Sequence, residues 1–176
     1  MSIDKIIVMR YYVGKEDDDM EEITRMQKNL LLIRRTVGWT AEQFGEKIGV
    51  TRQTINNIEY GRNRLTKTQY IAMRSVLDAE MVQHPEDTDM LRTLLDVLVD
   101  HPDRYSEHDR NELLEKANML SPSILAGTTS RKAISREWMK CAGVILGSAV
   151  LGPVGIGVGM AAMSSWLLKV LGEGKK

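Results

Sequence analysis

The chain has 176 residues, of which 43% are hydrophobic and 27% are charged, a composition typical of a folded protein with room for one domain and appendages. A single cysteine, Cys141, excludes an intrachain disulfide and every zinc site built from several cysteines. The net charge is zero, but the charges are segregated along the chain. Residues 20–77 carry 10 basic and 5 acidic side chains, residues 78–120 carry 4 and 12, and residues 121–176 carry 7 and 2. The first block suits a polyanionic partner, and the acidic block does not.

Residues 1–19 form the first segment. Within it, residues 5–13 are rich in types that favour strands, and Gly14 and an acidic run follow them. We therefore expect a short strand or an N-terminal arm. The segment lacks the basic-then-apolar order of a secretory signal, which predicts a cytoplasmic location for the main body.

Residues 20–84 are predicted to form a helical head. Its first helix has apolar residues at steps of three and four and ends at Gly38. Thr40 then occupies an N-cap position with Gln43 three residues later, so a capping box opens a second helix, which ends at Gly49. The apolar positions of the first helix are Ile23, Met26, Leu30, Ile33 and Val37.

Two further helices complete this head. Thr51 is an N-cap for a third helix that extends to Tyr60, with Ile55 and Ile58 on its inner face. A polar, basic loop follows, and residues 68–81 have the pattern of a fourth helix. We therefore expect four or five helices in this part of the chain.

The segment 29–62 reads NLLLIRRTVGWTAEQFGEKIGVTRQTINNIEYGR and resembles the helix-turn-helix domains of the phage-repressor and Cro-like (XRE) class, because many positions agree at once. With its flanking helices the resemblance covers residues 21–77. It places Gly45 where the two helices cross, a position at which the family usually has Ala, and Gly49 where the turn needs a positive φ. Ala41 departs from the family pattern, which often has a Gln there to brace a phosphate. The resemblance implies binding to double-stranded DNA.

The helix after the turn presents side chains able to read base edges. In the major groove, Arg pairs with guanine O6 and N7, and Gln or Asn pairs with adenine N6 and N7. The predicted base-reading residues are Thr51, Arg52, Gln53, Asn56 and Asn57, with Arg52 and Gln53 foremost. The residues expected at phosphates are Thr40, Arg62, Asn63, Arg64 and Lys67. The resemblance also implies a structural ion pair between Arg34 and Glu59.

Residues 85–127 are predicted to form an acidic helical hairpin. A break is expected at His101, and a boundary at Ser121 and Pro122. Dimerisation through this hairpin would join two heads, which would then read half-sites about one DNA turn apart. The leucine-rich faces on which this rests are Leu91, Leu94, Leu95 and Leu98 in one helix, and Leu113, Leu114, Ala117 and Leu120 in the other.

Residues 128–176 consist of a basic lead-in followed by the uncharged, glycine-rich segment 141–168, which exceeds the ~20 residues that cross a bilayer. Trp138 and Trp166 near its ends suit a membrane interface. Four outcomes are open: a membrane-spanning helix, a hairpin turning at Pro153, the buried core of a soluble oligomer, or disorder. Glycines at four-residue steps favour close helix packing; they are Gly143, Gly147, Gly155 and Gly159.

Together these features predict an all-α protein with a helix-turn-helix head, an acidic helical middle and a glycine-rich hydrophobic C-terminal helix or hairpin. We expect a sequence-specific, repressor-like regulator of bacterial or phage type, a homodimer or larger, with a cytoplasmic head that the tail tethers to the inner face of the cell membrane or assembles. One alternative is a membrane-acting, toxin-like effector with an autoregulatory head; another is a scaffold that binds proteins. Because His84, His101 and His108 do not have the spacing of a ligand set, we expect no metal, cofactor or catalytic site.

Overall fold

The computed structural model describes residues 3–147, with side chains from Met20 onward. All regular secondary structure in this range is helical, which confirms the predicted all-α class. The α-helices are α1 (Ile3–Thr36), α2 (Ala41–Ile48), α3 (Arg52–Glu59), α4 (Lys67–Gln83), α5 (Asp89–Leu95), α6 (Glu107–Leu125) and α7 (Arg131–Leu146). A π-helical turn, Asp96–Asp100, continues α5, and a 3₁₀ turn, Pro102–Arg104, precedes α6.

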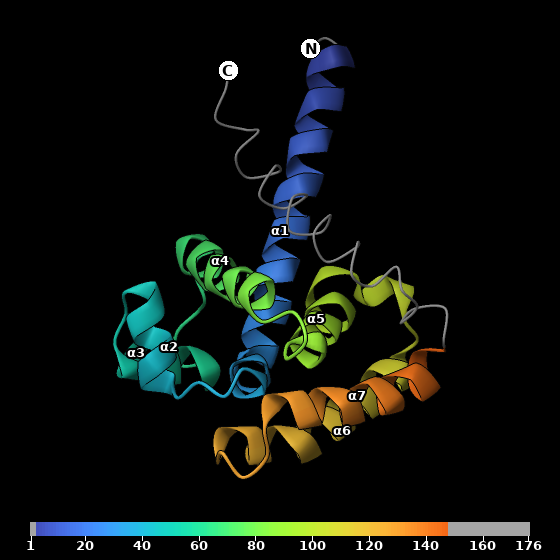
Figure 1. The fold of residues 1–176 in the computed structure, drawn as a ribbon. Coiled ribbons are helices and arrows are strands. Elements are labelled where there is room, and N and C mark those ends of the chain that lie inside the picture. The colour runs from blue at the N-terminus through green and yellow to red at the C-terminus, as the bar shows by residue number, and fades with distance from the viewer. Residues whose placement is uncertain (1–2, 148–176) are drawn as a thin grey trace.

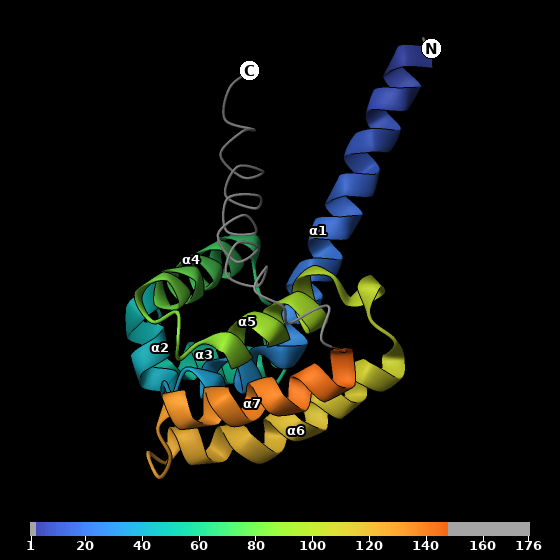
Figure 2. The ribbon, with the colours of Figure 1, turned by 45° about the vertical axis from the view of Figure 1, so that its right-hand side comes forward.

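The long helix α1 organises the molecule. Helices α2, α3 and α4 lie on one side of its C-terminal half and α5 on the other, while α6 and α7 run side by side across its end (Figures 1 and 2). The N-terminal half of α1 projects beyond these helices. The helix-turn-helix head and the helices that follow it therefore all pack around α1.

One hydrophobic core has contributions from every helix from α1 to α7. It includes Ile23 in α1, Phe44 in α2, Leu94 in α5, Leu113 in α6 and Trp138 in α7. The leucine-rich faces of the acidic segment therefore turn inward, although Leu114 and Leu120 are only half-buried. Dimerisation through residues 85–127 stays a prediction.

The expectation of a strand for residues 1–19 is wrong, because α1 begins at Ile3. Strand-favouring residues cost a helix at most about 0.7 kcal/mol each, so they do not exclude one. An isolated strand has no neighbour to pair with, whereas a helix held in the core beyond Met20 gains one hydrogen bond for each residue added to its end.

The expectation of a membrane interface for Trp138 is also wrong. Its side chain is 0% exposed and belongs to the core of the described chain. Trp138 lies on the inner face of α7, whose exposed positions are mostly charged, and burying an indole in protein satisfies the same apolar preference as an interface. The tryptophan's position beside an uncharged run did not distinguish these two environments.

Only the start of the glycine-rich segment lies in the described part of the chain. Gly143 lies within α7, and Gly147 follows it with a φ of 77°. Gly155, Gly159 and Trp166 lie outside the described residues. Within residues 3–147 no helix combines the length and the apolar character needed to cross a membrane.

Polar contacts attach α7 to the rest of the molecule. Arg131 Nη1 donates to Glu80 Oε1 in α4 at 2.5 Å and to the carbonyl of Val37, at the end of α1, at 3.4 Å. Ser135 Oγ donates to Asp89 Oδ2 in α5 at 2.8 Å. These bonds tie α7 to α1, α4 and α5.

Candidate nucleic-acid interface

The capping box predicted at the start of α2 is present. Gln43 N donates to Thr40 Oγ1 at 3.1 Å, and Thr40 N donates to Gln43 Oε1 at 2.9 Å. Thr40 is exposed, as a residue that binds a phosphate must be. Ala41, at the first position of α2, is buried and has no polar group to replace the glutamine that the family often carries there.

The turn between α2 and α3 is tight. Gly49 has a φ of 77°, in the left-handed region that favours glycine, and Val50 N donates to Gly45 O at 2.9 Å. A Cβ on Gly45 would stand only 2.6 Å from the carbonyl oxygen of Val50. The close approach of the turn to α2 therefore explains a glycine at position 45.

Helix α3 has a buried inner face and an exposed outer face. Thr51 Oγ1 caps the helix by accepting from Thr54 N at 3.2 Å, and Ile55 and Ile58 fix the helix to the core. The five residues predicted to read bases lie on α3 or at its cap: Thr51, Arg52 and Gln53 are exposed, and Asn56 and Asn57 are half-buried. Gln53 Nε2 donates to Asn57 Oδ1 at 3.1 Å, which links the two amides.

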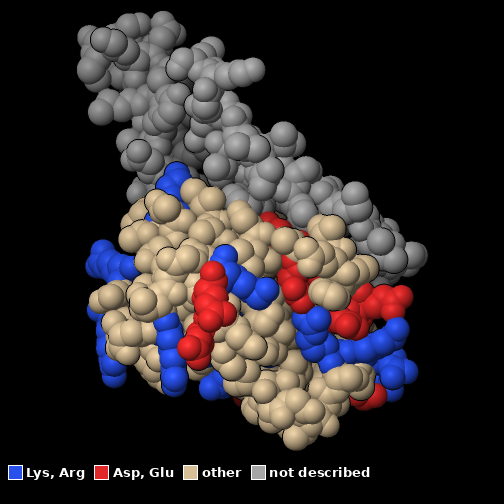
Figure 3. All heavy atoms as spheres, turned by 60° about the vertical axis from the view of Figure 1, so that its left-hand side comes forward, with Lys and Arg blue, Asp and Glu red and all other residues tan. Residues whose placement is uncertain are grey.

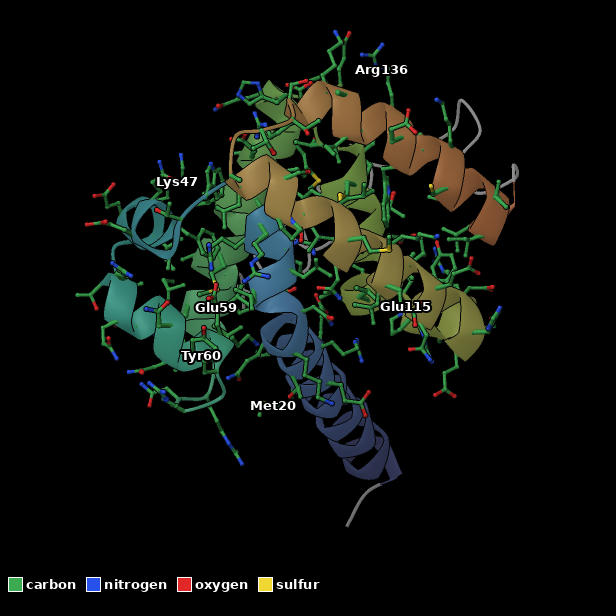
Figure 4. All side chains as sticks on the ribbon, turned by 90° about the horizontal axis from the view of Figure 1, so that it is seen from below. Met20, Lys47, Glu59, Tyr60, Glu115 and Arg136 are labelled. Atoms are coloured by element: carbon green, nitrogen blue, oxygen red, sulfur yellow. The ribbon has the colours of Figure 1, made fainter. Side chains whose placement is uncertain are left out.

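An ion pair behind α3 joins this helix to α1. Arg34 Nε and Nη2 donate to the two carboxylate oxygens of Glu59 at 2.5 and 3.0 Å, and Arg34 Nη1 donates to Trp39 O at 2.7 Å. The two charged side chains are 6% and 1% exposed. Figure 4 shows Glu59 between α3 and α1. These are the residues for which the resemblance implied a structural pair.

The loop after α3 carries the other residues predicted to bind phosphates. Gly61 has a φ of 69°, and the N–H groups of Arg62 and Asn63 both donate to Asn57 O, at 2.8 and 3.1 Å. Arg62, Asn63 and Arg64 are exposed. Lys67, also exposed, is the first residue of α4, which Thr66 caps.

The structure adds residues that the sequence did not indicate. Gln27 of α1 bonds to this loop across more than 30 positions in the chain, and no local pattern signals such a contact. The guanidinium of Arg62 lies 5.7 Å from the ring centre of the exposed Tyr60, and Lys47 Nζ lies 4.6 Å from that of Trp39. Both are cation–π distances.

Charge on this side of the molecule is mixed. Figure 3 looks onto the side that carries α2 and α3 and shows basic side chains along one edge, with acidic ones nearer the middle. A DNA-binding surface needs cations beside the reading helix, and the loop with Arg62 and Arg64 supplies two. Among the residues with described side chains, no cluster of three or more His, Cys, Asp or Glu side chains could hold a metal.

Comparison with known proteins agrees with this geometry. Residues 30–82 match the helix-turn-helix family model. No curated protein and no solved structure matches the chain. The match begins near the end of α1 and includes α2, the turn, α3 and nearly all of α4. Residues 30–82 of this chain are a helix-turn-helix DNA-binding domain of the XRE, or phage-repressor and Cro-like, type.

Proposed function

We propose that the protein is a sequence-specific transcriptional regulator that reads the major groove with α3. The observation that carries this proposal is an exposed polar face, Thr51 to Gln53, on a helix whose opposite face is fixed by Ile55, Ile58 and the buried Arg34–Glu59 pair. A reading helix must be held rigidly, since a base contact depends on geometry to within fractions of an ångström.

Arg52 and Gln53 are the proposed base-reading residues. Both lie in the first turn of α3, and the N-terminal residues of a recognition helix are those that reach base edges. Each bidentate contact contributes about 1–3 kcal/mol of discrimination against a wrong base. Arg62, Arg64 and the backbone amides of the first turn of α2, behind Thr40, would contact phosphates and fix the orientation of the domain.

A homodimer would increase both affinity and site length, because two copies would read an inverted repeat. Repression, dimerisation and a tail that attaches to a membrane or assembles the protein belong to this proposal. The segment that would carry the tail's role, 148–168, lies outside the described residues.

The proposal is tested by selecting bound duplexes from a random pool with the full chain. A variant with Arg52→Ala and Gln53→Ala is compared with a control, Arg136→Ala and Gln83→Ala, which removes the same side-chain types from exposed positions in α7 and at the end of α4. We expect an enriched motif from the wild type and the control. The reading variant should lose about 2–6 kcal/mol of discrimination from two base contacts.

Two results would refute the proposal. One is a wild-type chain that enriches no motif, which would favour a scaffold that binds proteins. The other is a reading variant that enriches the same motif as strongly as the control, because Arg52 and Gln53 would then not read bases.

A further inference from the structure

Gln27 makes three hydrogen bonds, one to the end of α3 and two to the loop that follows it. Its Nε2 donates to Ile58 O at 3.0 Å and to Asn63 O at 2.7 Å, and its Oε1 accepts from Leu65 N at 2.9 Å. A single half-buried amide of α1 thus bonds to the end of α3 and to both halves of the loop beyond it.

The loop held in this way carries exposed cations. Arg62 and Arg64 flank Asn63, whose carbonyl accepts the shortest of the three bonds. The backbone of the loop is further held by Leu65, which is buried, and by the acceptor Asn57 O. The arginine side chains reach solvent from a backbone that is bonded to α1.

We propose that Gln27 is a positioning residue for phosphate binding: it holds the loop so that Arg62 and Arg64 approach the DNA backbone in a fixed register with α3. The inference rests on the proposed function. Ordering a mobile loop on binding costs affinity, and a loop that is already ordered avoids that cost. Gln27 would therefore affect DNA affinity although it does not touch DNA.

The hydrogen-bonding pattern predicts which substitutions at position 27 would release the loop. Position 27 must donate two hydrogen bonds and accept one, which an amide does and other side chains of similar length do not. Gln27→Met keeps the length and removes all three bonds. Gln27→Glu keeps the acceptor for Leu65 N but places a carboxylate against two carbonyl oxygens, so both variants should release the loop.

The test measures binding of the full chain to a duplex of random sequence at several salt concentrations. Asn29→Ala is the matched control, because the Asn29 amide donates only within α1, to Arg25 O. We expect Gln27→Met to weaken binding about two- to tenfold. The slope of log affinity against log salt should fall by up to about 2, since each phosphate contact contributes about 0.9. Gln27→Glu provides the same measurement if the methionine variant does not fold.

Two further readouts separate positioning from a general loss of structure. Hydrogen exchange of the Leu65 amide, measured without DNA, should accelerate in Gln27→Met and stay slow in the control. In a background with Arg62→Ala and Arg64→Ala, Gln27→Met should have little further effect on affinity, whereas a general structural defect would weaken binding in that background too.

The outcomes are distinguishable. If wild-type protein shows no salt-dependent binding, both the proposed function and this inference are overturned. If wild-type protein binds and folded Gln27→Met keeps the wild-type affinity and slope, only the positioning role is overturned. The positioning role is overturned as well if the effect of Gln27→Met persists undiminished without the two arginines.

Discussion

The Arg34–Glu59 pair should be the most sensitive polar contact in the helix-turn-helix domain. Both side chains are almost fully buried, and two of the three hydrogen bonds that Arg34 donates go to Glu59. Glu59→Ala leaves a buried guanidinium with only the carbonyl of Trp39 as acceptor. Removing one partner of a buried pair costs about 3–5 kcal/mol, so we expect a loss of that size in the free energy of unfolding.

The same reasoning makes the double variant less damaging than either single change. Arg34→Met with Glu59→Leu leaves no buried charge, and replacing both partners of a buried pair by apolar residues is often neutral. One cost stays, because Trp39 O loses a donor, which amounts to about 1–3 kcal/mol. Glu59→Gln should fall between wild type and Glu59→Ala, since its amide oxygen still accepts one bond.

Urea unfolding followed by far-ultraviolet circular dichroism measures these differences. A typical domain is stable by about 5–15 kcal/mol, so Glu59→Ala should shift the midpoint far towards zero denaturant. The reasoning fails if Glu59→Ala costs less than about 1 kcal/mol, or if the double variant loses the sum of the two single losses.

Three further changes test other parts of the structure. Gly45→Ala should lower stability to urea by about 1–3 kcal/mol, because the new Cβ meets Val50 O at 2.6 Å and this outweighs the better helix propensity of Ala. Burial, helped by the nearby carboxylates, raises the pKa of Tyr70 and of Tyr105. The contribution of the two neutral phenols to folding stability is therefore complete below pH ~10 and is lost as the pH rises above it. Phenolate absorbance and circular dichroism, recorded together, measure this loss. Trp138→Ala should cost about 3–5 kcal/mol in thermal unfolding.

Each of these three predictions would be contradicted by a specific result. A Gly45→Ala protein as stable as the wild type would mean that the turn lies further from α2. Ionisation of Tyr70 and Tyr105 near pH 10 in a protein that keeps its native spectrum would mean that their surroundings do not raise the pKa. Loss of Trp138 without loss of stability would mean that α7 is not part of the core.

The helix-turn-helix formed by α2 and α3 was predictable because the sequence features that indicate it lie close together in the chain. The capping box of Thr40 and Gln43 spans three residues, and Gly49 marks the turn by its own conformational freedom. The ion pair of Arg34 with Glu59 spans 25 residues, and only the family resemblance indicated it. The nearer the partners lie in the chain, the less the prediction depended on knowledge of the fold.

Contacts across the fold left no such signal. Gln27 reads as one more polar residue on an amphipathic helix, and its three partners lie 31 to 38 positions away. Pro122 suggested a helix boundary, yet α6 continues to Leu125. Proline removes one hydrogen bond, and packing of Ile124, which lies against Gly38, supports the helix beyond it.

The end of α7 limits what the glycine-rich segment can do. Ala142 is 0% exposed and lies inside the uncharged run 141–168, so the run begins within the core of the described chain. A bilayer crossing needs about 20 residues, and the 22 residues of 147–168 would suffice with α7 still in place. Insertion from residue 141 would instead pull Ala142, and with it the turn that carries Trp138, out of the core. Because α7 is bonded to α4 through Arg131 and Glu80, such a movement would also displace or break a contact of the helix-turn-helix head.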